Sequence, residues 1–300
     1  MSSPLLRKGF AVASGVVALV AIAYGGLLGY LYVSQERLIF PATTLPADYQ
    51  FHFEQRFEEI RVPVAGGALD ALLFRQAEPR GLVFYLHGNG GDLTTWTTGL
   101  DFYRRINYDL FIIDYRGYGR SSGRIESEAQ LHEDVRAAWE TIAPRYRDVP
   151  IVLFGRSLGT ALATQLAPQV DPALLVLVTP CTSLAAPATR RYPFAPDFLL
   201  KYPLRTDAII GAVRSPVLLM AGTQDSLTPL ADSITLKSLV RAPVELLVVD
   251  GAHHNDIHRF PAYIDGLAER LSSIGDAHSF RAVPVLNPRT NSKPQSGDKP

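Results

Sequence analysis

The sequence is dominated by a series of short, continuous apolar runs that are bounded by turn-forming residues. They lie at 81–86, 108–113, 151–154, 174–178, 217–220 and 244–249. Patterns of helical period lie between or after them, at about 93–105, 126–143, 158–166, 230–240 and 259–274. Continuous runs of this length are typical of strands buried on both faces of a parallel sheet. With an alternating hairpin pattern at 57–64 and 68–74 before them, they predict an α/β fold, a mostly parallel central sheet with helices on both faces.

The N-terminal part of the chain has a different character. Residues 10–33 carry no charged side chain. The segment is longer than the roughly 20 helical residues that cross the hydrocarbon core of a bilayer. The apolar region of a cleaved signal peptide has only about 7–15 residues and precedes a small-residue cleavage site, whereas "SQERLIF" follows here. We therefore expect one N-terminal transmembrane helix as an anchor, in preference to a buried core helix.

The charges that flank this segment predict its orientation. Arg7, Lys8 and the N-terminal amine lie on one side and Arg37 on the other, so the positive-inside rule keeps residues 1–9 in the cytoplasm. The folded domain, expected over 34–274, would then lie on the non-cytoplasmic side, which is the periplasm in a bacterium. Residues 275–300 are rich in Pro, Ser, Asn and Lys and are expected to form a disordered tail.

Charge and cysteine content exclude several classes of function. The chain has 29 basic and 29 acidic residues, so no strong positive field favours nucleic acid as a partner. Cys181 is the single cysteine, which rules out an intrachain disulfide and leaves no cysteine cluster for a metal. No metal site is expected.

The stretch "GRSLG" at 155–159 follows a predicted strand and opens a predicted helix. In that context it matches the G-x-S-x-G nucleophile elbow, in which a strained turn exposes the serine hydroxyl at the carboxyl edge of the sheet. Larger side chains in place of the two glycines would strike the backbone of the crossing strand and helix. Ser157 is therefore the candidate nucleophile, although a small residue in a Gly-rich loop is the alternative.

A serine hydroxyl needs a base, and in this fold the acid and the histidine follow the serine in the chain. Asp225 lies in the loop after the run at 217–220, and His253 and His254 lie in the loop after the run at 244–249. All three loops leave the carboxyl ends of strands. Asp225 could instead cap the following helix, and rival acids remain at Asp232, Asp250 and Asp256.

An oxyanion hole for the reaction needs two N–H donors. The residue after the nucleophile, Leu158, supplies one. The loop "HGNGGD" after the run at 81–86 is expected to supply the other, with the N–H of Asn89 as the candidate. The alternative is a plain Gly-rich turn that enters a helix capped by Asp92.

Four motifs give the chain a resemblance to a known family: "HGNGG" at 87–91, "DYRGYGRSSG" at 114–123, "GRSLG" at 155–159 and "HND" at 254–256. From about residue 37 to 274 the chain resembles the α/β-hydrolase fold serine hydrolases. Within these it is similar to the membrane-anchored branch that includes protein depalmitoylases and lysophospholipid lipases. Relatives place the catalytic histidine directly before "ND", which selects His254. "MAGTQD" departs from the commoner "HG-x-x-D" before the acid, and "DYRGYGRSSG" is expected to be structural.

The resemblance implies hydrolysis of an ester or thioester through an acyl-enzyme, with a Ser157–His254–Asp225 triad and no cofactor. Residues 180–209 are expected to form a small lid. Its aromatic and basic residues would either build a slot for an acyl chain with a basic rim, or simply cover the sheet edge. Two other functions stay open: a serine aminopeptidase-like peptidase, and a non-catalytic, membrane-tethered binding module. A complete Ser, His and Asp set argues against the binding module.

Overall fold

The sheet has eight strands in the order β1-β2-β4-β3-β5-β6-β7-β8. The computed structural model describes residues 4–274. The strands are β1 (Phe57–Val64), β2 (Gly67–Phe74), β3 (Leu82–Leu86), β4 (Asp109–Ile113), β5 (Ile151–Arg156), β6 (Leu174–Val178), β7 (Val217–Gly222) and β8 (Val244–Val249). The β1–β2 and β2–β4 pairs are antiparallel, and every later pair is parallel. The predicted fold class, a mostly parallel α/β sheet that opens with a hairpin, is confirmed.

Helices cover both faces of the sheet and divide the core in two. The longer ones are α5 (Glu128–Ile142), α6 (Leu158–Val170), α9 (Leu230–Leu239) and α10 (Pro261–Ser272). Helices α5, α6 and α9 supply side chains to one apolar core, and α10 supplies side chains to the other. Along β5, Leu153 packs into the first core while Val152 and Phe154 pack into the second. Because alternate side chains enter opposite cores, both sets must be apolar, which explains the unbroken runs.

The prediction of a single helix over 93–105 is wrong in one respect. The structure has two short helices there, α3 (Leu93–Trp96) and α4 (Leu100–Arg105). Gly99 lies between them with a φ of 87°, a left-handed conformation that ends a right-handed helix and that glycine adopts at little cost. The side chain of Asp92 accepts a hydrogen bond from the N–H of Thr94 and caps α3. Asp92 is therefore a cap, as the alternative reading of this loop proposed.

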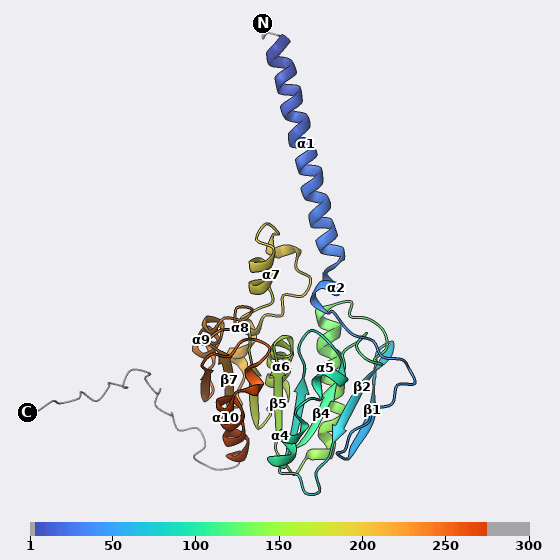
Figure 1. Cartoon of the computed structure of the whole chain (residues 1–300), viewed down its shortest axis with the longest axis vertical. Coiled ribbons are helices and arrows are strands. Elements are labelled where there is room, and N and C mark those ends of the chain that lie inside the picture. The colour runs from blue at the N-terminus through green and yellow to red at the C-terminus, as the bar shows by residue number, and fades with distance from the viewer. Residues whose placement is uncertain (1–3, 275–300) are drawn as a thin grey trace, which may run out of the picture.

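The N-terminal helix α1 (Pro4–Val33) projects from the domain (Figure 1). Its segment Phe10–Val33 has a mean hydropathy of 2.1, is not buried against the rest of the chain, and is long and apolar enough to cross a membrane. A short helix, α2 (Gln35–Ile39), connects it to the domain. The expected C-terminal tail lies outside the described residues.

The segment expected to form a lid, residues 180–209, contains the short helices α7 (Ala185–Arg191) and α8 (Thr206–Ile209). We call it the lid segment. In Figure 1, α7 and the loop after it rise from the sheet beside the lower part of α1. The hydroxyl of Tyr24, on α1, donates a hydrogen bond to the carbonyl of Phe194 at 2.7 Å, so the helix and the lid segment are in contact.

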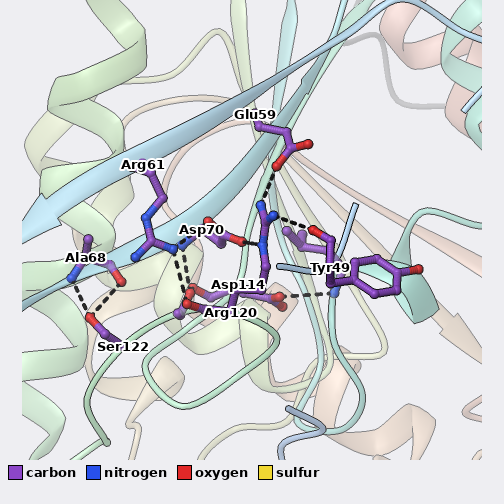
Figure 2. A network of polar contacts seen from close by, with 10 residues as sticks. Tyr49, Glu59, Arg61, Ala68, Asp70, Asp114, Arg120 and Ser122 are labelled. Carbon is purple, nitrogen blue, oxygen red and sulfur yellow. Dashed lines mark hydrogen bonds and ion pairs between the residues drawn. The ribbon is translucent and has the colours of Figure 1, made fainter. Parts of the chain in front are cut away.

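The motif at 114–123 is held by ion pairs, as its structural interpretation requires. Figure 2 shows Arg120 at the centre of a network, where its Nε donates to Asp70 at 2.5 Å and its Nη1 to the carbonyl of Tyr49 at 2.7 Å. Arg116 pairs with Asp134 on α5 at 2.5 Å, and both side chains are only 3% exposed. These contacts fix the loop against β2 and α5, beside the site described next.

Candidate active site

Ser157 occupies the turn between β5 and α6. Its φ of 51° and ψ of −117° fall in a region that non-glycine residues rarely adopt, so the turn is strained. The flanking glycines lie at close backbone approaches. A Cβ on Gly155 would come within 2.4 Å of the carbonyl oxygen of Gly159, and one on Gly159 within 2.0 Å of that of Leu86. The local geometry is that of a nucleophile elbow.

The structure brings Ser157, His254 and Asp225 together, although the chain separates them widely. The Nε2 atom of His254 lies 2.8 Å from the Oγ of Ser157. Its Nδ1 atom lies 2.8 Å from Oδ2 of Asp225. The imidazole can therefore accept the serine proton on one nitrogen while the carboxylate holds the N–H of the other.

Asp225 is set in place by the loop that carries it. Its Oδ1 accepts hydrogen bonds from the N–H groups of Leu227 at 2.9 Å and Thr228 at 2.8 Å. Burial raises the pKa of this carboxyl, but hydrogen bonds from His254 and Thr228 outweigh burial, so the pKa of Asp225 is lowered below its ordinary value. The carboxylate is thus ionised at neutral pH, as an acid that steadies an imidazolium must be.

The three rival acids have other partners. Asp250 accepts from the hydroxyl of Thr223 at 3.0 Å, and Asp256 accepts from the backbone N–H of His253 at 2.7 Å. Asp232 lies 3.7 Å from Arg190. His253 itself is exposed. The 2.8 Å distance from Asp225 to His254 favours Asp225 as the candidate acid, a choice that the sequence left open.

Thr228 is a site residue that the sequence reasoning missed. Its hydroxyl donates to Oδ2 of Asp225 at 2.7 Å and lies 3.1 Å from Nδ1 of His254. The signal available was the spacing in "DSLT", since an aspartate often binds N–H groups two and three residues later in a turn. Thr228 therefore binds both oxygens of the carboxylate, Oδ1 through its N–H and Oδ2 through its hydroxyl, and restricts its position.

The two oxyanion-hole candidates, Leu158 and Asn89, lie near Ser157. Leu158 is the first residue of α6, where backbone N–H groups have no partner within the helix. Asn89 lies in the loop after β3, and both residues line the same cavity as Ser157. A Cβ added at the neighbouring Gly88 would lie 3.6 Å from the Cβ of Ser157, so this loop approaches the serine closely.

The orientation of the Asn89 N–H is set by His87, which is fully buried. Nδ1 of His87 lies 2.6 Å from the carbonyl oxygen of Gly88. That carbonyl and the N–H of Asn89 belong to one planar trans peptide and point in opposite directions. The hydroxyls of Tyr115 and Tyr118 donate to the carbonyls of His87 and Asn89 at 2.9 and 2.6 Å. The motif at 114–123 therefore fixes the backbone of this loop.

His87 also lies close to Asp114, an acid for which the sequence predicted no partner. Its Nε2 lies 3.4 Å from Oδ1 of Asp114, and neither side chain is exposed. Burial raises the pKa of the Asp114 carboxyl, although His87 opposes that shift. The two ring nitrogens of His87 thus have different neighbours, the Gly88 carbonyl at Nδ1 and Asp114 at Nε2. No sequence pattern linked residues 87 and 114, because they meet only where β3 and β4 end side by side.

The cavity in front of Ser157 is apolar and has a volume of about 270 Å³. Leu38 and Ile39 of α2 form one wall, and Leu184, Ala188 and other residues of the lid segment form another. Cys181 also lines it. Burial, first of several causes, raises the pKa of this thiol to about 12, so the cysteine stays protonated.

The basic residues of the lid segment were expected either to form a basic rim around an acyl slot or to belong to a simple cover over the sheet edge. Their positions give some support to each interpretation. Arg191 lines the cavity and lies over the ring of Tyr192 at 5.8 Å. Arg190, Lys201 and Arg205 pair with Asp232, Glu36 and Asp207 at 3.7, 3.1 and 2.6 Å. Within the described residues 4–274, no group of three or more His, Cys, Asp or Glu side chains could hold a metal ion.

Known proteins resemble this chain in sequence. Residues 77–203 match the family described as "Serine aminopeptidase, S33". The human α/β hydrolase domain-containing protein 17B is 31% identical over 244 residues, which are 75% of this chain and 80% of that protein. Protein 17C of the same name from Xenopus tropicalis is 33% identical over 244 residues, 75% of this chain and 74% of the relative.

Solved structures resemble it in fold. An esterase from Pyrococcus furiosus superposes with a TM-score of 0.62 at 18% identity, covering 78% of this chain and 98% of the esterase. A monoacylglycerol lipase from Paleococcus ferrophilus gives a TM-score of 0.55 at 20% identity, with 68% and 98% covered. At these identities the likeness establishes a shared fold.

Proposed function

We propose a specific activity for this chain, which is a hydrolase and belongs to the family of α/β hydrolase domain-containing proteins 17. The proposal is a membrane-anchored serine hydrolase that cleaves carboxylic ester or thioester bonds of acyl substrates. The observation that carries the proposal is the continuous hydrogen-bonded line from Ser157 through His254 to Asp225, with 2.8 Å at each step. The strained elbow at Ser157 supports it.

In the proposed mechanism, Oγ of Ser157 attacks the carbonyl carbon of the substrate while Nε2 of His254 takes the hydroxyl proton. The negative oxygen of the tetrahedral intermediate would be stabilised by the N–H groups of Leu158 and Asn89; losing one such donor typically costs about 10²–10³ in turnover. The intermediate collapses as the alcohol or thiol leaves with the proton from His254. Water then attacks the acyl carbon while His254 takes a proton from it, and His254 returns that proton to Oγ of Ser157 as the C–Oγ bond breaks and the carboxylic acid is released. None of these proposed reaction steps requires a metal or a cofactor.

An acyl substrate is favoured by the lining of the cavity. The side chains around Ser157 come mainly from leucine, isoleucine and alanine, and an acyl chain gains free energy when its methylenes leave water for such a surface. The lid segment supplies part of this lining, in agreement with its interpretation as a slot for an acyl chain.

A peptidase is the second candidate, because the matched family is described as a serine aminopeptidase. An aminopeptidase needs a carboxylate or another acceptor for the free α-amino group of its substrate. None of the described residues that line the cavity is acidic, and the charged one among them is Arg191. This charge distribution favours the acyl substrate over the aminopeptide.

We further propose that α1 anchors the protein in a membrane with the domain on the non-cytoplasmic side. The exposed apolar surface of Phe10–Val33 supports the anchor, and Arg7 and Lys8 before it support the orientation. A protease added to intact spheroplasts should digest the domain. Protection until the membrane is permeabilised would contradict the orientation.

A substrate series tests the chemistry. The full chain, purified in detergent, is assayed against p-nitrophenyl esters and matched S-acyl thioesters from acetyl to palmitoyl, and against aminoacyl p-nitroanilides. We expect kcat/KM to be higher for esters or thioesters than for every aminoacyl substrate, and Ser157→Ala to abolish the activity. Preference for aminoacyl substrates would favour the peptidase, and inactivity toward all substrates would favour the binding module.

A further inference from the structure

A second apolar hollow lies between the anchor and the lid segment. Leu31, Tyr32 and Leu38 line it from the side of α1 and α2, and Ala188, Ala195 and Leu199 line it from the lid segment. Its volume is about 90 Å³. We call it the anchor groove. None of the catalytic candidates lines it, so the proposed mechanism does not account for it.

The anchor groove adjoins the cavity in front of Ser157. Leu38, Ile39 and Tyr192 are among the residues that line both hollows, so they form the boundary between them. Leu38 is 41% exposed and is not locked in a core. A chain of methylenes lying in the groove would pass these side chains to reach the serine.

The lid segment contacts the anchor at a position that lies within the hydrocarbon core when α1 spans the bilayer. The segment Phe10–Val33 has 24 residues, about 36 Å of helix, and the hydrocarbon core is about 30 Å thick. At most about 6 Å of the segment can then project from the core. Tyr24, which is hydrogen-bonded to Phe194, lies about 14 Å before the end of the segment.

The tip of the lid segment is therefore placed about 8 Å inside the hydrocarbon boundary. A shift of α1 away from the cytoplasm could lift the tip out, but it would draw Lys8 and Arg7 into the hydrocarbon, which is costly. The surface of the lid segment suits an apolar environment, since Phe194 at the tip is 44% exposed and Phe198, further along the segment, is 84% exposed. Figure 1 shows α7 and the loop after it rising beside the lower part of α1.

We propose that the tip of the lid segment inserts into the bilayer beside the anchor and that the anchor groove admits one acyl chain of an amphiphile held in that leaflet. The chain enters sideways from the membrane, passes Leu38 and Tyr192, and presents its ester or thioester carbonyl to Ser157. This inference rests on the proposed function and specifies its substrate as membrane-resident. The anchor then forms one wall of the substrate path as well as holding the enzyme at the bilayer.

An activity test fills the anchor groove and leaves the cavity at Ser157 open. Ala195 lines the groove but not the cavity, so Ala195→Trp should obstruct the groove, and Ala195→Ser is the matched control. The full chain is reconstituted in phosphatidylcholine vesicles and assayed with dissolved p-nitrophenyl butyrate and with p-nitrophenyl palmitate embedded in the vesicles.

We expect Ala195→Trp to lower kcat/KM for the palmitate about tenfold or more while the butyrate changes less than about twofold, because the short ester does not need the groove. Ala195→Ser should leave both rates unchanged. Equal effects on the two substrates, or none, would overturn the inference. Wild-type protein that cleaves neither ester would instead contradict the proposed function.

A second measurement does not depend on activity. Phe194→Trp places a fluorophore at the residue that contacts Tyr24, and Asp101→Trp places one on α4, at the far end of the domain (Figure 1). In vesicles of dibrominated phosphatidylcholine, emission from the first variant should shift to the blue and be quenched relative to the second. Equal quenching of the two variants would show that the tip lies in water and would overturn the inference.

Discussion

Replacing Gly159 with alanine perturbs the site through one methyl group. Gly159 lies in the first turn of α6, where this helix crosses the end of β3. A Cβ would lie 2.0 Å from the carbonyl oxygen of Leu86 and 2.8 Å from that of His87. Both obstacles are backbone atoms, so no rotation of a side chain can relieve the contact.

The size of the effect follows from these distances. A carbon needs about 3 Å from a carbonyl oxygen, so α6 must move about 1 Å away from β3 or the strand must bend. Overpacking of this kind costs about 1–3 kcal/mol of stability, and a 1 Å displacement of a reacting group can cost about 10²-fold in rate. Because Ser157 and Leu158 adjoin Gly159, we expect Gly159→Ala to lose about 10²-fold in kcat and about 1–3 kcal/mol of unfolding free energy.

The assay compares Gly159→Ala with Gly90→Ala. A Cβ at Gly90 meets no atom within 4 Å, so this control alters a glycine of the neighbouring loop without a clash. The kcat for p-nitrophenyl butyrate and urea unfolding are measured for wild type and both variants. A Gly159→Ala enzyme with wild-type kcat and stability would refute the reasoning, as would a control as impaired as the test variant.

Three further outcomes are expected. Asp225→Asn keeps an acceptor for the N–H of Thr228 but can turn its amide N–H₂ toward His254. We therefore expect kcat in the butyrate assay to fall about 10³–10⁴-fold. A loss below tenfold would contradict the role of Asp225 as the catalytic acid. Burial raises the pKa of Asp225, but hydrogen bonds lower it overall. A lowered folded pKa gives stability above the unfolded pKa that is lost as pH falls through the folded value. The stability difference between wild type and Asp225→Asn in urea should therefore shrink below about pH 4, and a pH-independent difference would exclude this linkage. Asp134→Ala leaves Arg116 buried without its carboxylate, so chemical unfolding should show a loss of about 3–5 kcal/mol, with part of it recovered in an Arg116→Met background; an unchanged midpoint would mean that the loop is held by other contacts.

The sequence predicts much of the fold because burial on both faces of a parallel sheet leaves a simple pattern. Each parallel strand expected from an apolar run is present, and Ser157 is at the elbow that "GRSLG" predicted. The break at Gly99 was not predicted, since helical periodicity continues on both sides of it. A single left-handed residue leaves the pattern intact while it ends the helix.

The details of the site are harder to predict because they depend on where side chains from distant loops point. The sequence placed Asp225 and Asp250 at adjacent strand ends but could not say which carboxylate reaches His254. The approach of His87 to Asp114 becomes visible only once β3 and β4 are known to lie side by side, whereas the spacing in "DSLT" was a local signal for Thr228. The contact between Tyr24 and Phe194 joins two segments that no local pattern connects.

The most direct measurement is covalent labelling of the full chain with a fluorophosphonate, followed by mass spectrometry of the labelled peptide. The account predicts one adduct, on Ser157, that is absent from Ser157→Ala and forms much more slowly in His254→Ala. An unlabelled wild-type protein, or an adduct that persists after Ser157→Ala, would contradict the assignment of Ser157 as the nucleophile.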